Sequence, residues 1–313
     1  MKAKTIKAVI RKRIDAWLES IDDESVRDMV AKNTIVTGGC IASMLLDEKV
    51  NDIDIYFRDR ETTLRAARYY VDRFKPKHRN GIPCAIHVDD ASPDRVRVII
   101  KSAGIASEDG SKKEYQYFET RPEGEAGGYV GEVMTDSGEI EDTYEQTEEA
   151  SLRDSESDKS FRPVFMSTNA ITLSGGVQIV LRFYGSPDQI HDNYDFVHCT
   201  NYWTSWDSDL ELKPAALEAL LTKELRYVGS KYPICSVIRL RKFIRRGWTI
   251  NAGQILKMAM QISELDLKDH NVLEDQLTGV DAAYFVEVVE RLRENDPEKV
   301  NAAYLIEIIN RMF

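Results

Sequence analysis

The chain has 313 residues, of which 42% are hydrophobic and 30% are charged, and its formal net charge is −11. This length suffices for two domains with buried cores, and no apolar run approaches the roughly 18 residues that cross a bilayer. The sequence therefore predicts no membrane partner. Widely spaced cysteines argue against a disulfide framework or a zinc knuckle: Cys40, Cys84, Cys199 and Cys235. We expect a protein of the reducing cytoplasm, without a signal peptide.

The acidic charge is concentrated in one part of the chain. Residues 105–160 contain 17 acidic and 5 basic side chains, which leaves 36 acidic and 37 basic side chains elsewhere. The acidity thus belongs to an insertion rich in Gly, Glu, Asp, Ser and Thr, which is typical of a loop rather than a core. With the insertion set apart, the net charge is no argument against binding to nucleic acid.

The first 74 residues alternate between helical and strand-like patterns. Apolar residues at helical spacing predict helices over 4–21 and 62–74, and a plausible N-cap precedes another helix at 23–32. Between them we expect a strand at 34–37, a glycine turn, a short helix ending near Leu46 and a strand at 52–58.

The middle of the chain predicts a series of strands, and the end predicts helices. Strands are expected at 95–100, 115–118, 163–165, 170–173, 177–183 and 194–199, with a short helix at 186–190. Helical spacing then recurs at 213–228, 233–246, 251–264, 271–277, 281–294 and 297–312. We therefore expect one mixed domain over 1–206 and a helical domain over 207–313.

The segment from Thr37 to Phe57 carries the clearest chemical pattern. Gly38 and Gly39 open the short helix, where exposed N–H groups and the helix dipole favour a phosphate. Asp52 and Asp54 follow in a strand-like run, so they share one face about 6.6 Å apart along the backbone. Two carboxylates held this close repel each other and suit a divalent cation. A solvated aspartate pair at a strand end is the alternative interpretation.

This pattern resembles the motif of the polymerase-β-like nucleotidyltransferase superfamily, in which glycines precede an Asp-hydrophobic-Asp strand by about ten residues. Here Val36-Thr37-Gly38-Gly39 and Asp52-Ile53-Asp54-Ile55 match, although Thr37 is less apolar than the usual residue. The superfamily includes poly(A) polymerases, CCA-adding enzymes, cyclic-dinucleotide synthases and protein-adenylylating toxins. The resemblance implies an α+β fold, with a mixed sheet flanked by helices and an all-helical C-terminal domain. The looser match is to uncharacterised phage and viral members.

The resemblance also implies a metal-dependent reaction. Asp52 and Asp54 would hold Mg²⁺ or Mn²⁺, and a third carboxylate on a neighbouring strand would complete a two-metal site. Asp195 is the candidate for this carboxylate, because it starts the apolar run at 194–199. Weaker rivals are Asp192, Asp188 and Asp90.

The basic helical region after residue 213 resembles the part of the superfamily that contacts the triphosphate and base. The expected substrate is a nucleoside triphosphate, with ATP the first choice. Candidate nucleotide-binding residues are Gly38, Gly39, Ser43, Lys223, Ser236, Arg239 and Lys242. The alternative for each of these cations is a solvated basic helix.

The acceptor of the nucleotide is not determined by the sequence. An RNA 3′ end is the first choice because of the basic helix, a protein hydroxyl is the second, and a second nucleotide, as in a cyclic or oligonucleotide synthase, is the third. A catalytically silent binding module is an alternative from a different class. The oligomeric state is left open, and a phage-encoded protein would act in the host cytoplasm.

Overall fold

The computed structural model describes residues 1–50, 52–74, 85–92, 94–102, 115–117, 161–166 and 169–267, together with residues 269, 272 and 276. Most of the acidic insertion lies outside these residues, as do the helices predicted at 281–294 and 297–312 and most of the one predicted at 271–277.

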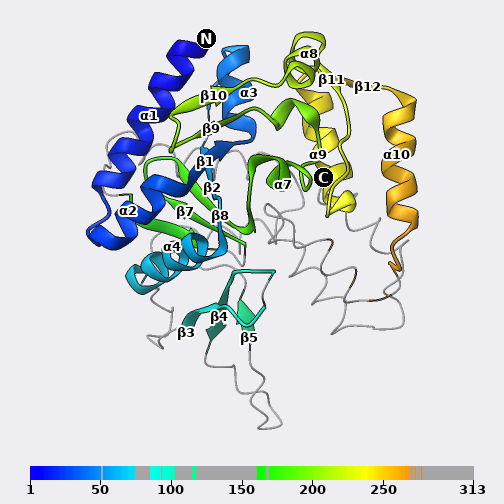
Figure 1. Ribbon diagram of the computed structural model, residues 1–313. Coiled ribbons are helices and arrows are strands. Elements are labelled where there is room, and N and C mark those ends of the chain that lie inside the picture. Colours follow the sequence, from blue (N-terminus) through cyan, green and yellow to red (C-terminus); the bar gives the residue numbers. More distant parts are fainter. Residues whose placement is uncertain are drawn as a thin grey trace, which may run out of the picture.

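A seven-stranded mixed sheet lies at the centre of the described fold, with the strand order β10-β9-β1-β2-β8-β7-β6 (Figure 1). Strands β2 and β8 are parallel, and all other neighbours in this sheet are antiparallel. The strands are β1 (Thr34–Thr37), β2 (Ile53–Phe57), β6 (Pro163–Met166), β7 (Ala170–Leu173), β8 (Val177–Tyr184), β9 (Tyr202–Thr204) and β10 (Asp209–Glu211). This architecture confirms the predicted α+β class.

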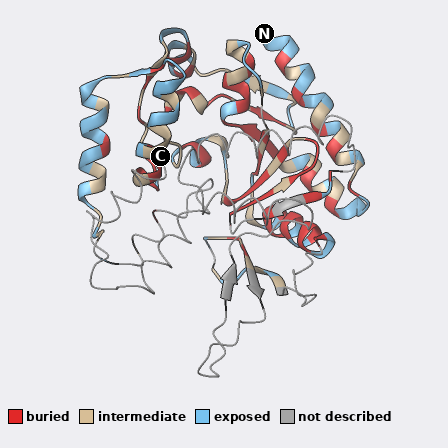
Figure 2. Cartoon of the chain, turned by 180° about the vertical axis from the view of Figure 1, so that it is seen from behind, coloured by how far each residue is buried: buried red, intermediate tan, exposed pale blue. Residues whose placement is uncertain are grey.

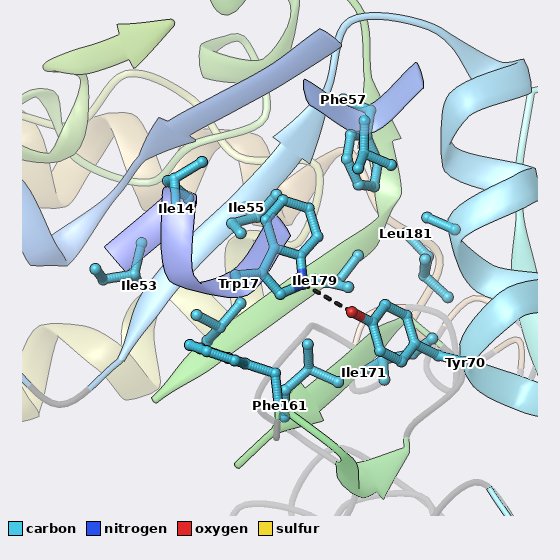
Figure 3. Close-up of a cluster of buried hydrophobic side chains, with 14 of the residues drawn as sticks. Ile14, Trp17, Ile53, Ile55, Phe57, Tyr70, Phe161, Ile171, Ile179 and Leu181 are labelled. Carbon is cyan, nitrogen blue, oxygen red and sulfur yellow. Dashed lines mark hydrogen bonds between the residues drawn. The ribbon is translucent and has the colours of Figure 1, made fainter. Parts of the chain in front are cut away.

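One face of the sheet packs against the N-terminal helices, which are α1 (Ala3–Glu19), α2 (Glu24–Asn33), α3 (Gly39–Leu46) and α4 (Arg60–Arg73). Alternation along β2 directs Ile53 and Ile55 into this core. At its centre Trp17 of α1 donates its indole N–H to the hydroxyl of Tyr70 on α4, at 2.7 Å (Figure 3). Burying each large apolar side chain stabilises the fold by about 1.5–3 kcal/mol.

The opposite face of the sheet carries the candidate site. A smaller apolar cluster covers it, formed by Ile35, Tyr56, Val180 and Ile190. Ile190 belongs to α7 (Pro187–His191), whose N-terminus is fixed by the capping box of Ser186 and Gln189. Because β2 alternates, Asp54 and Tyr56 lie on this face.

The C-terminal part of the described chain is mainly helical, as predicted. It contains α8 (Pro214–Thr222), β11 (Glu224–Leu225), α9 (Pro233–Arg245), β12 (Thr249–Ile250) and α10 (Ala252–Ser263). An apolar cluster including Leu220, Tyr227 and Trp248 packs these elements against Ala42 of α3. In Figure 2 the sheet is mostly buried, whereas α10 is mostly exposed.

Two predicted elements of this region are wrong. The strand expected at 194–199 is a 3-10 helix, Val197–Cys199, preceded by a single bridge between Phe196 and Tyr227. Phe196, the buried apolar residue of this run, packs against Tyr227 and Phe243 rather than in a continuous strand pairing. The helix expected at 213–228 ends at Thr222, because Lys223 adopts a left-handed conformation with φ 49° and leads into β11.

The main sheet also continues past residue 206, where the boundary between domains was expected. Strand β10 pairs with β9, and Leu210 lies opposite Trp203. The expected boundary therefore falls inside a β-hairpin of the main sheet.

A second sheet consists of three antiparallel strands, β3 (Ala85–Asp89), β4 (Arg97–Ser102) and β5 (Tyr115–Tyr117), and its last strand lies within the acidic insertion. It projects from the main body below α4 in Figure 1. Within the described residues, no helix combines the length and the apolar character that a membrane crossing requires.

Candidate active site

The turn between β1 and α3 lies at the centre of the site. Gly38 is the N-cap of α3 and has a φ of 101°, a conformation that favours glycine. Its N–H donates to the carbonyl oxygen of Cys199 at 3.2 Å. Gly39 is exposed, and among the described residues beyond its chain neighbours and the backbone of its own helix, no atom lies within 4 Å of the position that a Cβ atom would take there. The turn therefore combines one fixed and one open glycine at the positive end of a helix.

The carboxylate of Asp54 lies directly against this turn. A Cβ atom on Gly38 would be 2.9 Å from Oδ2 of Asp54 and 3.6 Å from the hydroxyl of Tyr194. Asp54 and Asp52 are both half-buried, and Asp52 immediately precedes β2. Gly38 and Asp54, which are sixteen positions apart in the sequence, are thus brought together, as the motif predicts.

The negative charges of Asp52 and Asp54 affect the pKa values of the neighbouring thiols. Burial raises the pKa of Cys40 well above its ordinary value, and the charges of Asp54 and Asp52 raise it further. Burial likewise raises the pKa of Cys199 to about 12, with additional contributions from Asp195 and Asp54. Both thiols therefore stay protonated. The pKa of Cys199 is raised by the charges of both Asp54 and Asp195.

Asp195 has a different set of partners from the one expected of a metal ligand. Its Oδ1 accepts a hydrogen bond from the hydroxyl of Ser236 at 2.7 Å, and its Oδ2 forms an ion pair with Arg239. The side chain of Asp195 is 11% exposed and that of Arg239 is 25% exposed. The backbone of Asp195 also accepts from the N–H of Val228 at 2.9 Å. Asp195 therefore links the segment between α7 and the 3-10 helix to α9.

The structure locates the other predicted nucleotide-binding residues as follows. Ser43 lies one turn into α3 and is half-buried, and Lys242 is exposed on α9. The ammonium group of Lys223 is 3.7 Å from the carboxylate of Glu48, which follows α3. Of the C-terminal candidates, Ser236 and Arg239 contact Asp195, whereas Lys223 contacts the segment after α3.

A buried polar network beside the turn was missed by the sequence analysis. The hydroxyl of Thr37 donates to the carbonyl oxygen of Asn201 at 2.9 Å, so it accepts from Nε2 of His191 at 2.8 Å. Nδ1 of His191 then accepts from the ammonium of Lys213 at 3.2 Å, and Lys213 also contacts Asp188 at 2.7 Å. Burial, followed by the charge of Lys213, lowers the pKa of His191 to about 4. The neutral imidazole therefore holds the side chain of Thr37, the residue that precedes Gly38, in place.

Tyr194 is a second residue that the sequence pattern did not single out for this position. Its ring contacts those of His191 and Tyr56, at centroid distances of 5.1 and 6.1 Å. Burial raises the pKa of its hydroxyl well above the ordinary value, with smaller contributions from Tyr56 and Asp54. No local sequence pattern could indicate that Tyr194 contacts the glycine turn, because Tyr194 reaches the turn only through the packing of α7 on the sheet.

The donor set fits a hard divalent cation at the Asp52 and Asp54 pair. Carboxylate oxygens are the preferred ligands of Mg²⁺, which usually keeps several waters and substrate phosphates in its shell. Opposite Asp54 on the parallel strand β8 lies the amide Gln178 rather than a third carboxylate. Across the part of the chain that the structure describes, no three His, Cys, Asp or Glu side chains are grouped to hold a metal ion.

The fold and the site together define an α+β protein with a glycine turn packed against a carboxylate strand. The chain belongs to the Gabija anti-defense 2 family, whose model matches residues 8–223. A comparison with curated proteins finds no match.

Among solved structures, the chain has a distant likeness to CCA-adding enzymes. The Thermotoga maritima CCA-adding enzyme complexed with tRNA is 12% identical, with a TM-score of 0.38, and 95% of this chain covers 58% of that one. The Bacillus stearothermophilus CCA-adding enzyme in complex with CTP is 13% identical, with a TM-score of 0.34, and 92% of this chain covers 53% of that one. The chain thus spans little more than half the length of these enzymes.

Proposed function

We propose that the protein is a metal-dependent nucleotidyltransferase that moves an NMP from an NTP to a hydroxyl acceptor. The observation that carries this proposal is the contact between the Gly38 turn and Oδ2 of Asp54, which a Cβ atom on Gly38 would approach to 2.9 Å. A phosphate cradle and a carboxylate lie close together here. One place on the protein therefore meets both requirements of phosphoryl chemistry.

The glycine turn supplies the phosphate cradle of this proposal. The N–H groups at the start of α3 have no partner within the helix, and the dipole places partial positive charge there. The N–H of Gly38 is occupied by Cys199, so Gly39 and the following residues supply the donors. Gly39 has open space around it, which allows a triphosphate to approach the backbone closely.

Asp52 and Asp54 would hold Mg²⁺ or Mn²⁺ beside this cradle. The ion would neutralise phosphate charge and orient the α-phosphate when bound. The chain's own contribution is to place the two carboxylates at the start of β2, where Asp54 lies against the glycine turn. In the transfer, the acceptor oxygen forms a bond to the α-phosphorus, the bond to the leaving pyrophosphate breaks, and the hydroxyl proton is lost.

We assign Asp195 to the acceptor side of the site. The segment that carries Asp195 reaches the glycine turn, because the carbonyl oxygen of Cys199 accepts from the N–H of Gly38 at 3.2 Å, and this contact supports the assignment. The ion pair with Arg239 orients the carboxylate in the absence of substrate. A carboxylate there can accept a hydrogen bond from the attacking hydroxyl or join the cation shell.

For the acceptor, an RNA 3′ end is the first candidate, supported by the exposed cations of α9. A hydroxyl on a protein of the Gabija defence system is the second, and the match to the Gabija anti-defense 2 family favours it. Transfer to a second nucleotide is the third. We further propose a phage-encoded protein that acts in the host cytoplasm.

One experiment tests the proposal and separates the acceptors. The full chain is incubated with each α-labelled NTP, with Mg²⁺ or Mn²⁺, and with total host RNA or a lysate that contains the Gabija proteins. Label in RNA, in a protein band or in a small product identifies the acceptor, and a stronger signal with one NTP tests the expectation of ATP. Absence of metal-dependent incorporation and of pyrophosphate release under all these conditions would support a catalytically silent binding module instead.

A further inference from the structure

Helix α9 carries a row of cations that begins at the candidate site. Arg239, Lys242 and Arg246 follow one another at steps of three and four residues, so they lie close to one line along the helix. We call these three residues the α9 row. With a rise of 1.5 Å per residue, the row is about 10 Å long. Arg239 is its inner end, because it forms an ion pair with Asp195.

The outer members of the α9 row carry uncompensated charge. Lys242 and Arg246 are exposed, and neither forms an ion pair within the described chain. Several other cations nearby are paired, such as Arg226 with Glu218 and Lys213 with Asp188. Like charges lined up without counter-charges repel one another, so the surface attracts an anion with repeated charges.

The α9 row also follows the edge of the packed face of the helix. Leu240 and Phe243, on the neighbouring positions, pack into the apolar cluster of the C-terminal part. The cations therefore border the junction between α9 and the body of the protein, where Asp195 lies. A line of charges at such a junction suits the phosphate backbone of one strand, and the exposed Arg241 and Arg245 add positive charge on other positions around the same helix.

We propose that the α9 row binds the phosphate backbone of a single-stranded nucleic acid whose terminal hydroxyl is directed toward Asp195 and Asp54. This inference rests on the proposed function, because it takes the acceptor site to lie beside Asp195. It differs from the expectation that Lys242 contacts the triphosphate. Phosphate contacts of this kind position a strand without reading its sequence, so binding should tolerate different sequences.

Direct binding by the full chain tests the proposal without any catalytic step. The probe is a fluorescent single-stranded RNA of about 20 nucleotides, measured by anisotropy at several salt concentrations without NTP or metal. The test variant is Lys242→Gln/Arg246→Gln. The matched control is Lys4→Gln/Lys12→Gln, which removes two exposed cations of α1, the helix on the other side of the molecule from α9 (Figure 1).

We expect the α9 variant to bind the RNA at least about fivefold more weakly at low salt, with a log–log salt slope reduced by about 1.4 for two lost phosphate contacts. The control should bind like the wild type. Equal RNA affinity of the α9 variant and the wild type would overturn the proposal. So would equal competition by a polyglutamate peptide of matched charge, which would indicate an acidic protein partner.

Two further outcomes keep this inference separate from the proposed function. Loss of NTP affinity in the α9 variant, with RNA affinity unchanged, would assign the row to the triphosphate and overturn the inference alone. Wild-type RNA binding through the α9 row, with no nucleotide transfer to any acceptor, would overturn the proposed function and leave the nucleic-acid surface in place.

Discussion

Oδ2 of Asp54 occupies the space into which a side chain on Gly38 would project, with 2.9 Å between the carboxylate oxygen and the position of that Cβ atom. Two features therefore favour a glycine at this position. Its φ of 101° is unfavourable for other residues, and the carboxylate leaves no room for a side chain. The position of the carboxylate therefore depends on the absence of a side chain at Gly38. Substitutions at either position should therefore affect both phosphate and metal binding.

The first prediction concerns Gly38→Ala. We expect a loss of about 1–3 kcal/mol in the free energy of unfolding from backbone strain at this φ, and loss of nucleotide transfer because Asp54 must shift. Gly39→Ala is the control for stability, since no atom lies within 4 Å of its Cβ position. Thermal melts of both variants measure the difference, and equal melting temperatures would contradict the tight contact.

The second prediction concerns the carboxylate pair. Asp54→Asn and Asp52→Asn should each abolish transfer without lowering the stability of the metal-free protein, because the substitution removes mutual repulsion. A cation that binds only the folded protein stabilises it, by about 2.7 kcal/mol at one hundred times its dissociation constant. Mn²⁺ should therefore raise the melting temperature of the wild type and of the exposed control Asp28→Asn, but not of the two variants. A wild type indifferent to Mn²⁺, together with less stable variants, would make the pair structural.

The unit from β1 to β2 could be predicted because its information is local. The glycine turn, the helix and the aspartate strand follow one another within residues 37–57, and the periodicity of each is undisturbed. The fold class followed from the family resemblance that this motif carries. What the sequence could not report is the role of residues that meet only through tertiary packing.

His191 illustrates this limit, because its contact with Thr37 joins residues 154 positions apart. The contacts of Ser236 and Arg239 with Asp195 span 41 and 44 positions, so a basic helix alone could not show that one of its cations points inward. The apolar run at 194–199 looked like a strand because burial against Tyr227 and Trp248 imposes the same composition as strand pairing.

The third prediction concerns the pair formed by Asp195 and Arg239. Asp195→Asn should retain NTP binding but lose transfer, because Asp52 and Asp54 still hold the nucleotide side of the site. Arg239→Gln leaves a mostly buried carboxylate with Ser236 as its remaining side-chain partner, and we expect a loss of about 1–3 kcal/mol in stability. A double-mutant cycle, read by urea unfolding, should give a coupling energy of about 0.5–3 kcal/mol. Additive effects would show that the ion pair contributes nothing, and an unimpaired Asp195→Asn enzyme would move the acceptor-side role to another residue.

The fourth prediction concerns the pH dependence of stability. Burial lowers the pKa of both His191 and His198 from 6.5 to about 4, with Lys213 contributing at His191. Between about pH 6.5 and 4 the unfolded chain binds protons that the folded protein does not, so the free energy of unfolding must fall as the pH falls through this window. At about 1.4 kcal/mol per unit of pKa, each histidine accounts for up to about 3 kcal/mol of this loss.

The variant His198→Phe isolates one of these contributions. The imidazole of His198 lies 4.3 Å from the ring of Trp248 and 4.7 Å from that of Phe243, between centroids, so an aromatic ring suits the site. Urea unfolding of the wild type and the variant at pH 8 gives the cost of the substitution with the histidine neutral. Below pH 6.5 the variant should lose stability less steeply than the wild type, and the gap between the two curves should stop growing near pH 4. Parallel curves over the whole range would show that His198 takes up a proton in the folded protein, and that the aromatic cluster does not exclude its charge.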